Sequence, residues 1–420
     1  MQQTAHPPRR IRGFAWRLAL LFLLAALTGV HDAAAEQVTL RVAFWGDASE
    51  VTDIWLPIKA AFEQSHPGVE LELMYAPDGF AEKIAAMAAA GEGPDIWMAT
   101  PLMAVEFWNL GLLTDLAPIM ERDPEFRLED YFAAAIEGYR LGEAQLGFPT
   151  HFQVIGIWYH TSLLEEAGLP APQDGWTWEE FRSYAQRLTK RTPDGVTTQW
   201  GTTTPWSMNH WMPWIFSAGG NIVDDFENPT RSRINTLDTL EAFEFWHELV
   251  TVDQAAPPSG DDTPFFEGRA GMYPYVAVLQ RLNARAAFHY NVAPLPAGKA
   301  GSINAVLPSG IVMGRTDHPE EAWAAIKFIA RSPLITANAI PAHVEVARGE
   351  WPVVPVPEGY RREVWLSSAL TARSGVIKHL QAGEINSLVT QMRQGIIGSE
   401  SVRIIAERIS PLMDALLSGE

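Results

Sequence analysis

The N-terminal third of the chain alternates between two hydrophobic periods, and this alternation constrains the fold more than any other feature. Apolar residues recur at every second position over 38–44 and again over 69–75, which predicts two strands. Helical spacing follows each strand, at 54–62 and 81–90, and a short apolar run at 95–99 predicts a third strand. Strands and helices that alternate in this way form a largely parallel sheet covered by helices, so the sequence predicts an α/β fold.

The chain is long enough for more than one such domain. Its 420 residues, at about 150 residues a domain, predict two or three domains. The 50 acidic and 31 basic side chains give a formal charge of −19, which argues against sequence-independent nucleic-acid binding. The chain contains no cysteine, which excludes disulfides, thiolate metal sites and cysteine nucleophiles.

The first 35 residues have the layout of a secretory signal peptide. Four arginines precede an apolar run over 18–30, and the small triplet Ala33–Ala35 is followed by polar residues. The apolar run is too short to span a bilayer comfortably, and no cysteine follows it that could carry a lipid anchor. We therefore expect cleavage after Ala35, a mature chain with a formal charge of about −22, and a periplasmic location.

Motifs of catalysis and of nucleotide or metal binding are missing from the sequence. It has no HExxH pair, Walker A loop, GxGxxG turn, GxSxG elbow or EF-hand loop. The 11 histidines are scattered, and the acidic pairs at 165–166 and 224–225 resemble solvated faces or helix caps. We expect no catalytic residue, no metal site and no cofactor.

Seven short motifs resemble, in their order along the chain, segments of the extracellular solute-binding proteins of ABC importers. They are GEGPD at 91–95, GLLTDL at 111–116, FPTHFQVIGIWYHTSLLEEAGL at 148–169, a helix start TWEE within 175–188, FEGRAGM at 266–272, VAPLPAG at 292–298 and PEEAWAAIKFIA at 319–330. Each motif alone is weak, and their shared order carries the resemblance. The branch that they resemble is the sugar-binding one typified by the maltose-binding protein.

The resemblance implies the fold of the periplasmic binding proteins, in which two α/β lobes grip a solute in the cleft between them. Closure is then a hinge motion that the solute favours by contacting both lobes. The implied boundaries are 36–148 plus 307–340 for lobe 1, 152–305 plus 350–420 for lobe 2, and hinges near 149–152, 306–309 and 341–350. We expect a non-enzymatic monomer that binds no nucleic acid and delivers a carbohydrate or polyol to the transmembrane subunits of an ABC permease.

Two alternative functions stay open. A secreted carbohydrate-active hydrolase would also be acidic and rich in tryptophan, of which the chain has 16, but it needs two carboxyl groups about 5–10 Å apart. The solute could instead be an anionic sugar derivative such as a glycerol phosphate, since Arg348 is a positively charged residue that could pair with it. Lysine and arginine are scarce in the proposed pocket segments, which favours the neutral solute.

A sugar site combines flat aromatic surfaces for C–H faces with a polar partner for each buried hydroxyl. In open α/β sheets such groups sit at the C-terminal ends of strands, and we add the predicted crossings and the segment 200–220, which we expect to be loop-like. The resemblance adds Tyr273 and Tyr275, which follow the motif at 266–272, where the family commonly places an aromatic that contacts the ligand. The candidate ligand-binding residues are Trp45, Asp47, Thr150, His151, Phe152, Trp206, Asn209, His210, Trp211, Trp214, Gly220, Tyr273, Tyr275 and Gly310. Core packing stays an alternative for Trp45 and the tryptophans of 200–220, and His151 could equally be a buried hinge residue.

Overall fold

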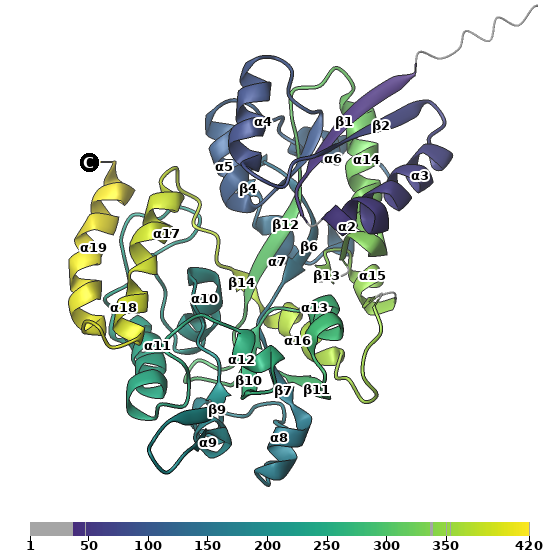
Figure 1. The fold of residues 1–420 in the computed structure, drawn as a ribbon. Helices are drawn as coiled ribbons and strands as arrows, with labels where there is room; N and C mark the ends of the chain where they lie inside the picture. The colour runs from purple at the N-terminus through teal and green to yellow at the C-terminus, as the bar shows by residue number, and fades with distance from the viewer. Residues whose placement is uncertain (1–36, 47, 337–338, 350, 353, 420) are drawn as a thin grey trace, which may run out of the picture.

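The computed structural model describes residues 37–46, 48–336, 339–349, 351–352 and 354–419. The predicted signal peptide and Asp47 lie outside the described residues. Two sheets organise the chain, one in each half of the molecule, and extended segments run from one half to the other (Figure 1). None of the described helices is long and apolar enough to cross a membrane.

The first half contains the predicted α/β alternation. Its sheet has the order β13-β6-β12-β3-β1-β2, with β14 beside β12. Strand β1 pairs in parallel with β2 and β3, while β12 runs antiparallel to β3 and β6. The strands are β1 (Val38–Phe44), β2 (Val69–Tyr75), β3 (Ile96–Ala99), β6 (Phe148–Gln153), β12 (Ala305–Met313), β13 (Ile340–Pro341) and β14 (Arg373–Ser374).

Helices cover this first sheet, and buried apolar side chains of β1 face those of α3 and α14. The ring of Phe44 stacks on Trp55 at 4.2 Å, which fixes the turn before α3 against the sheet. The elements are α2 (Ala48–Glu50), α3 (Leu56–Ser65), α4 (Phe80–Ala89), α5 (Pro101–Asn109), α6 (Ala117–Arg122), α7 (Ala133–Glu137), the small hairpin of β4 (Arg140–Leu141) and β5 (Ala144–Gln145), and α14 (Pro319–Arg331).

The second half is built on a sheet of order β11-β7-β10-β9-β8. Its strands are β7 (Gly156–His160), β8 (Lys190–Arg191), β9 (Thr197–Thr202), β10 (Ala270–Tyr275) and β11 (Tyr290–Ala293). Its helices are α8 (Thr161–Glu166), α9 (Trp178–Leu188), α10 (Met208–Ser217), α11 (Leu237–His247), α12 (Thr263–Phe266) and α13 (Leu279–Arg285). The capping box at the start of α9 is present, with the Thr177 side chain bonded to the Glu180 amide and the Glu180 side chain to the Thr177 amide.

The C-terminal part of the chain returns to the second half. Helices α15 (Val344–Gly349) and α16 (Glu363–Thr371) follow β13, and α17 (Ala382–Thr390), α18 (Met392–Ile396) and α19 (Val402–Ser418) complete the chain. Figure 1 shows these last three helices, in yellow, beside α10 and α11.

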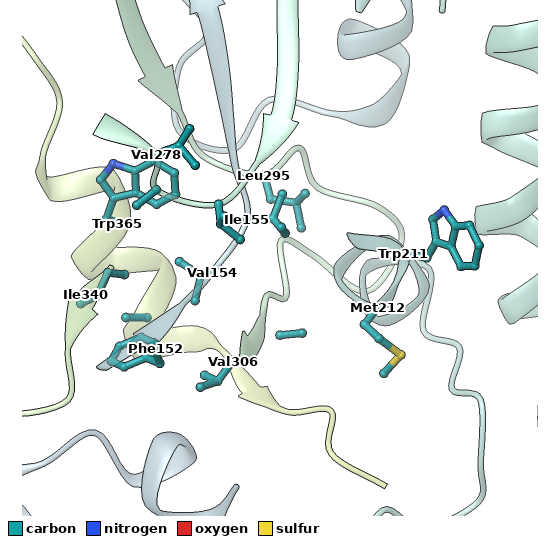
Figure 2. Close-up of a cluster of buried hydrophobic side chains, with 14 of the residues drawn as sticks. Phe152, Val154, Ile155, Trp211, Met212, Val278, Leu295, Val306, Ile340 and Trp365 are labelled. Atoms are coloured by element: carbon teal, nitrogen blue, oxygen red, sulfur yellow. The ribbon is translucent and has the colours of Figure 1, made fainter. Parts of the chain in front are cut away.

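The halves are joined by a packed core at the crossing from β6 to β7. Asn304, buried at the start of β12, donates through its amide nitrogen to the carbonyl of Ile155 (2.6 Å) and accepts from the Ile155 amide (2.9 Å). Phe152, Val154 and Val306 surround this point (Figure 2). The two extended segments therefore lie side by side and are bonded to each other where they cross.

The segment 200–220, expected as a loop, instead contains the end of β9 and helix α10. Six consecutive residues of α10, from Trp211 to Phe216, are buried. A helix that is buried on nearly all sides is apolar all round, so it lacks the amphipathic period that reveals a surface helix. Pro213 inside the helix further conceals it, since proline normally ends a helical pattern.

Candidate functional site

A cavity of about 490 Å³, the main cavity, lies where the two halves meet. Residues of the crossing strands β6 and β12 form one wall. The first half adds the start of α5, and the second half adds the start of α10, the end of β10 and the chain from 375 to 386. Each half therefore contributes side chains to the same space.

A smaller cavity of about 150 Å³, the side chamber, adjoins the main cavity within the second half. The two cavities share Ser207, His210 and Tyr275 in their walls. Trp206 and Tyr273 line the side chamber only. Because the shared residues border both spaces, the side chamber lies directly beside the main cavity.

Aromatic rings form the wall between the two cavities. Tyr273 and Tyr275 are two residues apart on β10, and their rings stack with centroids 4.7 Å apart and an interplanar angle of 12°. The centroid of the His210 ring lies 4.7 Å from that of Tyr275. The Tyr273 hydroxyl donates to Asp262 Oδ2 at 3.0 Å. Burial, with Tyr275 and Asp262 nearby, raises the pKa of Tyr273 well above its ordinary value, so this hydroxyl stays protonated.

His151, on the crossing strand β6, is bonded to its neighbour through one ring nitrogen. The Thr150 hydroxyl lies 2.9 Å from His151 Nδ1 and 3.3 Å from the Ser309 carbonyl oxygen. Burial lowers the pKa of His151 to about 4, so the ring is neutral near pH 7. Because Thr150 engages Nδ1, Nε2 is the ring nitrogen left for a hydrogen bond with a ligand hydroxyl.

His210, in the first turn of α10, is anchored in a similar way. Its Nδ1 lies 2.8 Å from the hydroxyl of Ser207, the N-cap residue of α10. Burial lowers the pKa of His210 to about 4 as well. Each histidine thus uses Nδ1 for a protein hydroxyl, which leaves Nε2 as the polar atom available to a ligand.

Charged groups are confined to the side chamber. Among the described residues that line the main cavity there is no aspartate, glutamate, lysine or arginine. Asp262 in the side chamber is paired with Arg281 at 2.7 Å. Arg393, also in the chamber wall, donates from Nε to the Trp206 carbonyl at 2.7 Å. Asp262 and Arg393 are therefore both bonded to other groups of the protein.

Several residues predicted for the site are brought together from distant segments. His151, Asn209, His210 and Tyr275 line the main cavity. Trp206 and Tyr273 line the side chamber beside them. Thr150 is buried behind His151 and contacts its ring nitrogen, so it positions the imidazole from outside the lining.

Other predicted residues are placed in the core. Trp211 is 1% exposed, and Trp214 and Phe152 are fully buried. The Trp214 ring packs between Trp178 and Trp246, away from the cavities. Figure 2 shows Trp211 and Met212 leaving α10 in different directions. In this structure Trp211 and Trp214 line neither cavity, because other side chains already cover their rings.

Trp45 and the two predicted glycines pack against other parts of the protein and line neither cavity. Trp45 packs edge-on against Phe80 in the first half, at 4.8 Å between ring centroids. A Cβ on Gly220 would lie 2.7 Å from the Thr239 amide nitrogen, and one on Gly310 would lie 2.2 Å from the Phe148 carbonyl oxygen. The missing side chains of Gly220 and Gly310 therefore let backbone segments approach each other rather than a ligand.

Sequence reasoning missed part of the lining. Met208 and Met212 are four residues apart on α10, and their shared face would have been evident if the helix had been recognised. The segment 375–377 and Asn386 come from the C-terminal part of the chain. No local pattern connects this part with the cavity, because long-range packing brings it there.

The fold and the cavity between its halves define the class of two-lobed binding proteins. A model of the family described as bacterial extracellular solute-binding proteins matches residues 48–333. The chain belongs to this family, as its motifs predicted.

Known relatives cover most of the chain. An uncharacterized lipoprotein in the oleD 5′ region of Streptomyces antibioticus is 27% identical over 355 residues, which cover 80% of this chain and 74% of the relative. Among solved structures, the ABC substrate-binding protein Lmo0181 from Listeria monocytogenes, in complex with cycloalternan, has a TM-score of 0.77 at 19% identity. It covers 91% of this chain and 99% of its own. The sugar-binding protein MalE from Xanthomonas citri has a TM-score of 0.76 at 17% identity, with 91% and 98% covered. At these identities the two structures show the shared fold.

Proposed function

We propose that this protein is the solute-binding component of an ABC importer and captures a neutral carbohydrate or polyol. The main cavity carries this proposal, because its walls come from both halves of the molecule. A solute that contacts both walls stabilises the closed form over the open form. The cycloalternan of the Listeria complex and the description of the Xanthomonas protein as sugar-binding support the same class of solute.

The closing motion follows from the crossing strands. We assign lobe 1 to 36–148 plus 307–340 and lobe 2 to 152–305 plus 350–420, with hinges near 149–152, 306–309 and 341–350. The pairing of β6 with β12 overlaps two of these hinges, and its register shift between Ser309 and Gly310 falls at the edge of one of them. Closure there would bring the start of α5 toward α10 and leave each sheet intact.

Binding without turnover is favoured over hydrolysis. A glycosidase needs two carboxyl groups that flank the scissile bond. The described residues of the two cavity walls supply one, Asp262, and it is already paired with Arg281. The uncharged main cavity also favours a neutral solute over a glycerol phosphate. Among its described lining residues there is no lysine or arginine that could pair with a phosphate.

We further propose that the protein is exported to the periplasm after cleavage behind Ala35 and acts there as a monomer. Family membership supports an extracellular role. The Streptomyces relative is described as a lipoprotein, whereas this chain contains no cysteine that could carry a lipid. Delivery of the solute would then occur when the closed form docks on the permease subunits.

A thermal-shift screen against sugars, polyols and their phosphates tests the proposal. A neutral hit should raise the melting temperature by mass action, by an amount that grows with its concentration. The same hit should quench tryptophan fluorescence, because Trp206 lines the side chamber. Absence of any shift across the panel, or turnover of a chromogenic glycoside by the pure protein, would contradict the proposal.

A further inference from the structure

We propose that the solute is an uncharged glycoside with an apolar aglycone, which places its sugar ring against the side chamber and its aglycone in the main cavity. This inference rests on the proposed function and names the class of its solute. Three observations carry it: the distribution of charge, an apolar wall in the main cavity and the aromatic border of the side chamber.

The charges are arranged for a molecule without net charge. The main cavity has no ionisable acid or base of the Asp, Glu, Lys or Arg type among its described lining residues. In the side chamber Asp262 is neutralised by Arg281 at 2.7 Å, and the Arg393 guanidinium bonds the Trp206 carbonyl. An ion in either space would lose its hydration without gaining an unengaged counter-charge, which is costly.

One wall of the main cavity is apolar over a continuous stretch. Met208 and Met212 project from one face of α10, and Val376 and Ile377 follow β14 opposite them. Gly375, the residue before Val376, lies close to this face of α10, since a Cβ on it would be 3.2 Å from Met212 Cε. Methionine is flexible and adapts to irregular apolar shapes. A sugar ring laid on this stretch would find no hydrogen-bond partner among these four side chains, and each buried hydroxyl without a partner would cost free energy. The polar side chains of the main cavity, His151 among them, belong to other parts of its lining.

The border with the side chamber has the opposite character. The Tyr275 ring, which stacks on Tyr273 and lies beside His210, borders both spaces and stays partly exposed. His210 and Ser207 bring polar atoms to the same edge. Flat rings suit the C–H faces of a sugar, and the polar atoms suit its hydroxyls. The sugar and the apolar group therefore have separate surfaces. The main cavity, of about 490 Å³, leaves space for the apolar group when the sugar ring lies at the border with the side chamber.

The test compares matched glycosides by isothermal titration calorimetry on the exported protein. The probes are the free sugars and the methyl and hexyl glycosides of glucose, galactose, mannose and maltose. For each sugar that binds, we expect the hexyl glycoside to bind at least about tenfold tighter than the methyl glycoside, because its methylenes leave water. Its binding heat capacity should be more negative as well, a readout that needs no variant.

Variants of α10 locate the effect. Met208→Gln should reduce the hexyl-to-methyl affinity ratio to below about threefold, whereas Met208→Leu should keep it. Met120→Gln is the matched control, since Met120 is half-buried on α6 outside both cavities, and it should preserve the ratio. The melting temperature of each ligand-free variant checks that it is folded.

Each outcome decides a separate point. If the free sugars bind and the hexyl chain gives no gain in affinity or heat capacity, the inference is overturned and the proposed function stands. A gain that survives Met208→Gln in a folded variant also overturns it, because the aglycone then lies elsewhere. If neither free sugars nor glycosides bind, the proposed function fails and the inference falls with it.

Discussion

The two walls of the main cavity differ in nearly every property that matters for binding. Apart from the crossing strands β6 and β12, the wall from the first half is the start of α5, with Thr100, Pro101 and Leu102. The wall from the second half is far larger and includes Tyr275 and the first turns of α10. It also continues into the side chamber. From this difference we predict that the second half sets affinity and specificity, while the first half mainly closes over a solute that is already held.

The largest effect is expected from a buried tryptophan of the second half, which we predict to stabilise the fold rather than to contact the solute. Trp214→Ala should lower the free energy of unfolding by about 3–5 kcal/mol, because the residue is fully buried and leaves a cavity. At about 2–4 °C for each kcal/mol, the melting temperature should fall by at least about 6 °C. Differential scanning calorimetry of the ligand-free protein measures the change.

Trp206→Ala is the paired control, since Trp206 lines the side chamber and is only partly buried. It should change the melting temperature little and weaken solute binding. A Trp214→Ala protein that melts normally and loses its solute would reverse the assignment of Trp214 to the core.

The next largest effect is expected at the aromatic border. Tyr275→Ala removes a ring worth about 1.5–3 kcal/mol of buried contact, so affinity should fall by about 10- to 100-fold. Tyr275→Phe keeps the ring and its stacking on Tyr273, and it should lose far less. Calorimetric titration with the best solute from the thermal-shift screen gives both values. Equal losses in the two variants would show that the hydroxyl, rather than the ring face, holds the solute.

A smaller effect is expected on the opposite wall. Leu102→Ala shortens one side chain at the start of α5, and affinity should fall by only about threefold or less, well under the loss of a fully buried leucine. The change should lie in the dissociation rate, because most affinity differences within one interface do. Stopped-flow fluorescence measures the rates. A loss larger than that of Tyr275→Ala would place the dominant contacts in the first half and break the comparison.

The sequence predicted the fold well because its determinants are local. The periodic runs of β1 to β3 and the capping box at Thr177 act over a few residues, and both are present in the structure. His151 and Tyr275 could be placed near a cavity for a related reason, since a crossing and a strand end have fixed positions in this fold.

The remaining lining could not be predicted, because burial depends on what surrounds a side chain. Trp206 and Trp214 are alike in residue type and neighbourhood, yet one lines a chamber and the other is enclosed by α9 and α11. Composition counts both equally. The segment 375–377 reaches the cavity only through contacts between elements far apart in the chain, for which no alternating or helical period exists.

The smallest effect expected concerns the rim, where the two halves face each other with like charges. Glu106 on α5 approaches the start of α17, and its Oε1 lies 3.8 Å from the position of a Cβ on Gly383. Burial there, together with the charges of Glu384 and Glu82, raises the pKa of Glu106. The ionised carboxylate is thus disfavoured in this arrangement. The stability that protonation provides is full below the ordinary value of 4.5 and is lost as the pH rises through the raised pKa.

Glu106→Gln should therefore stabilise the protein above that range and not below it. At pH 7 its melting temperature should exceed that of the wild type by about 1 °C or less, since the group is largely exposed and water screens it. Near pH 4 the difference should vanish. Melting curves from pH 4 to 8 measure this, with Glu137→Gln, an exposed glutamate on α7, as the control. A gain independent of pH would mean that Glu106 acts through packing, and the like charges of the two walls would then not oppose their approach.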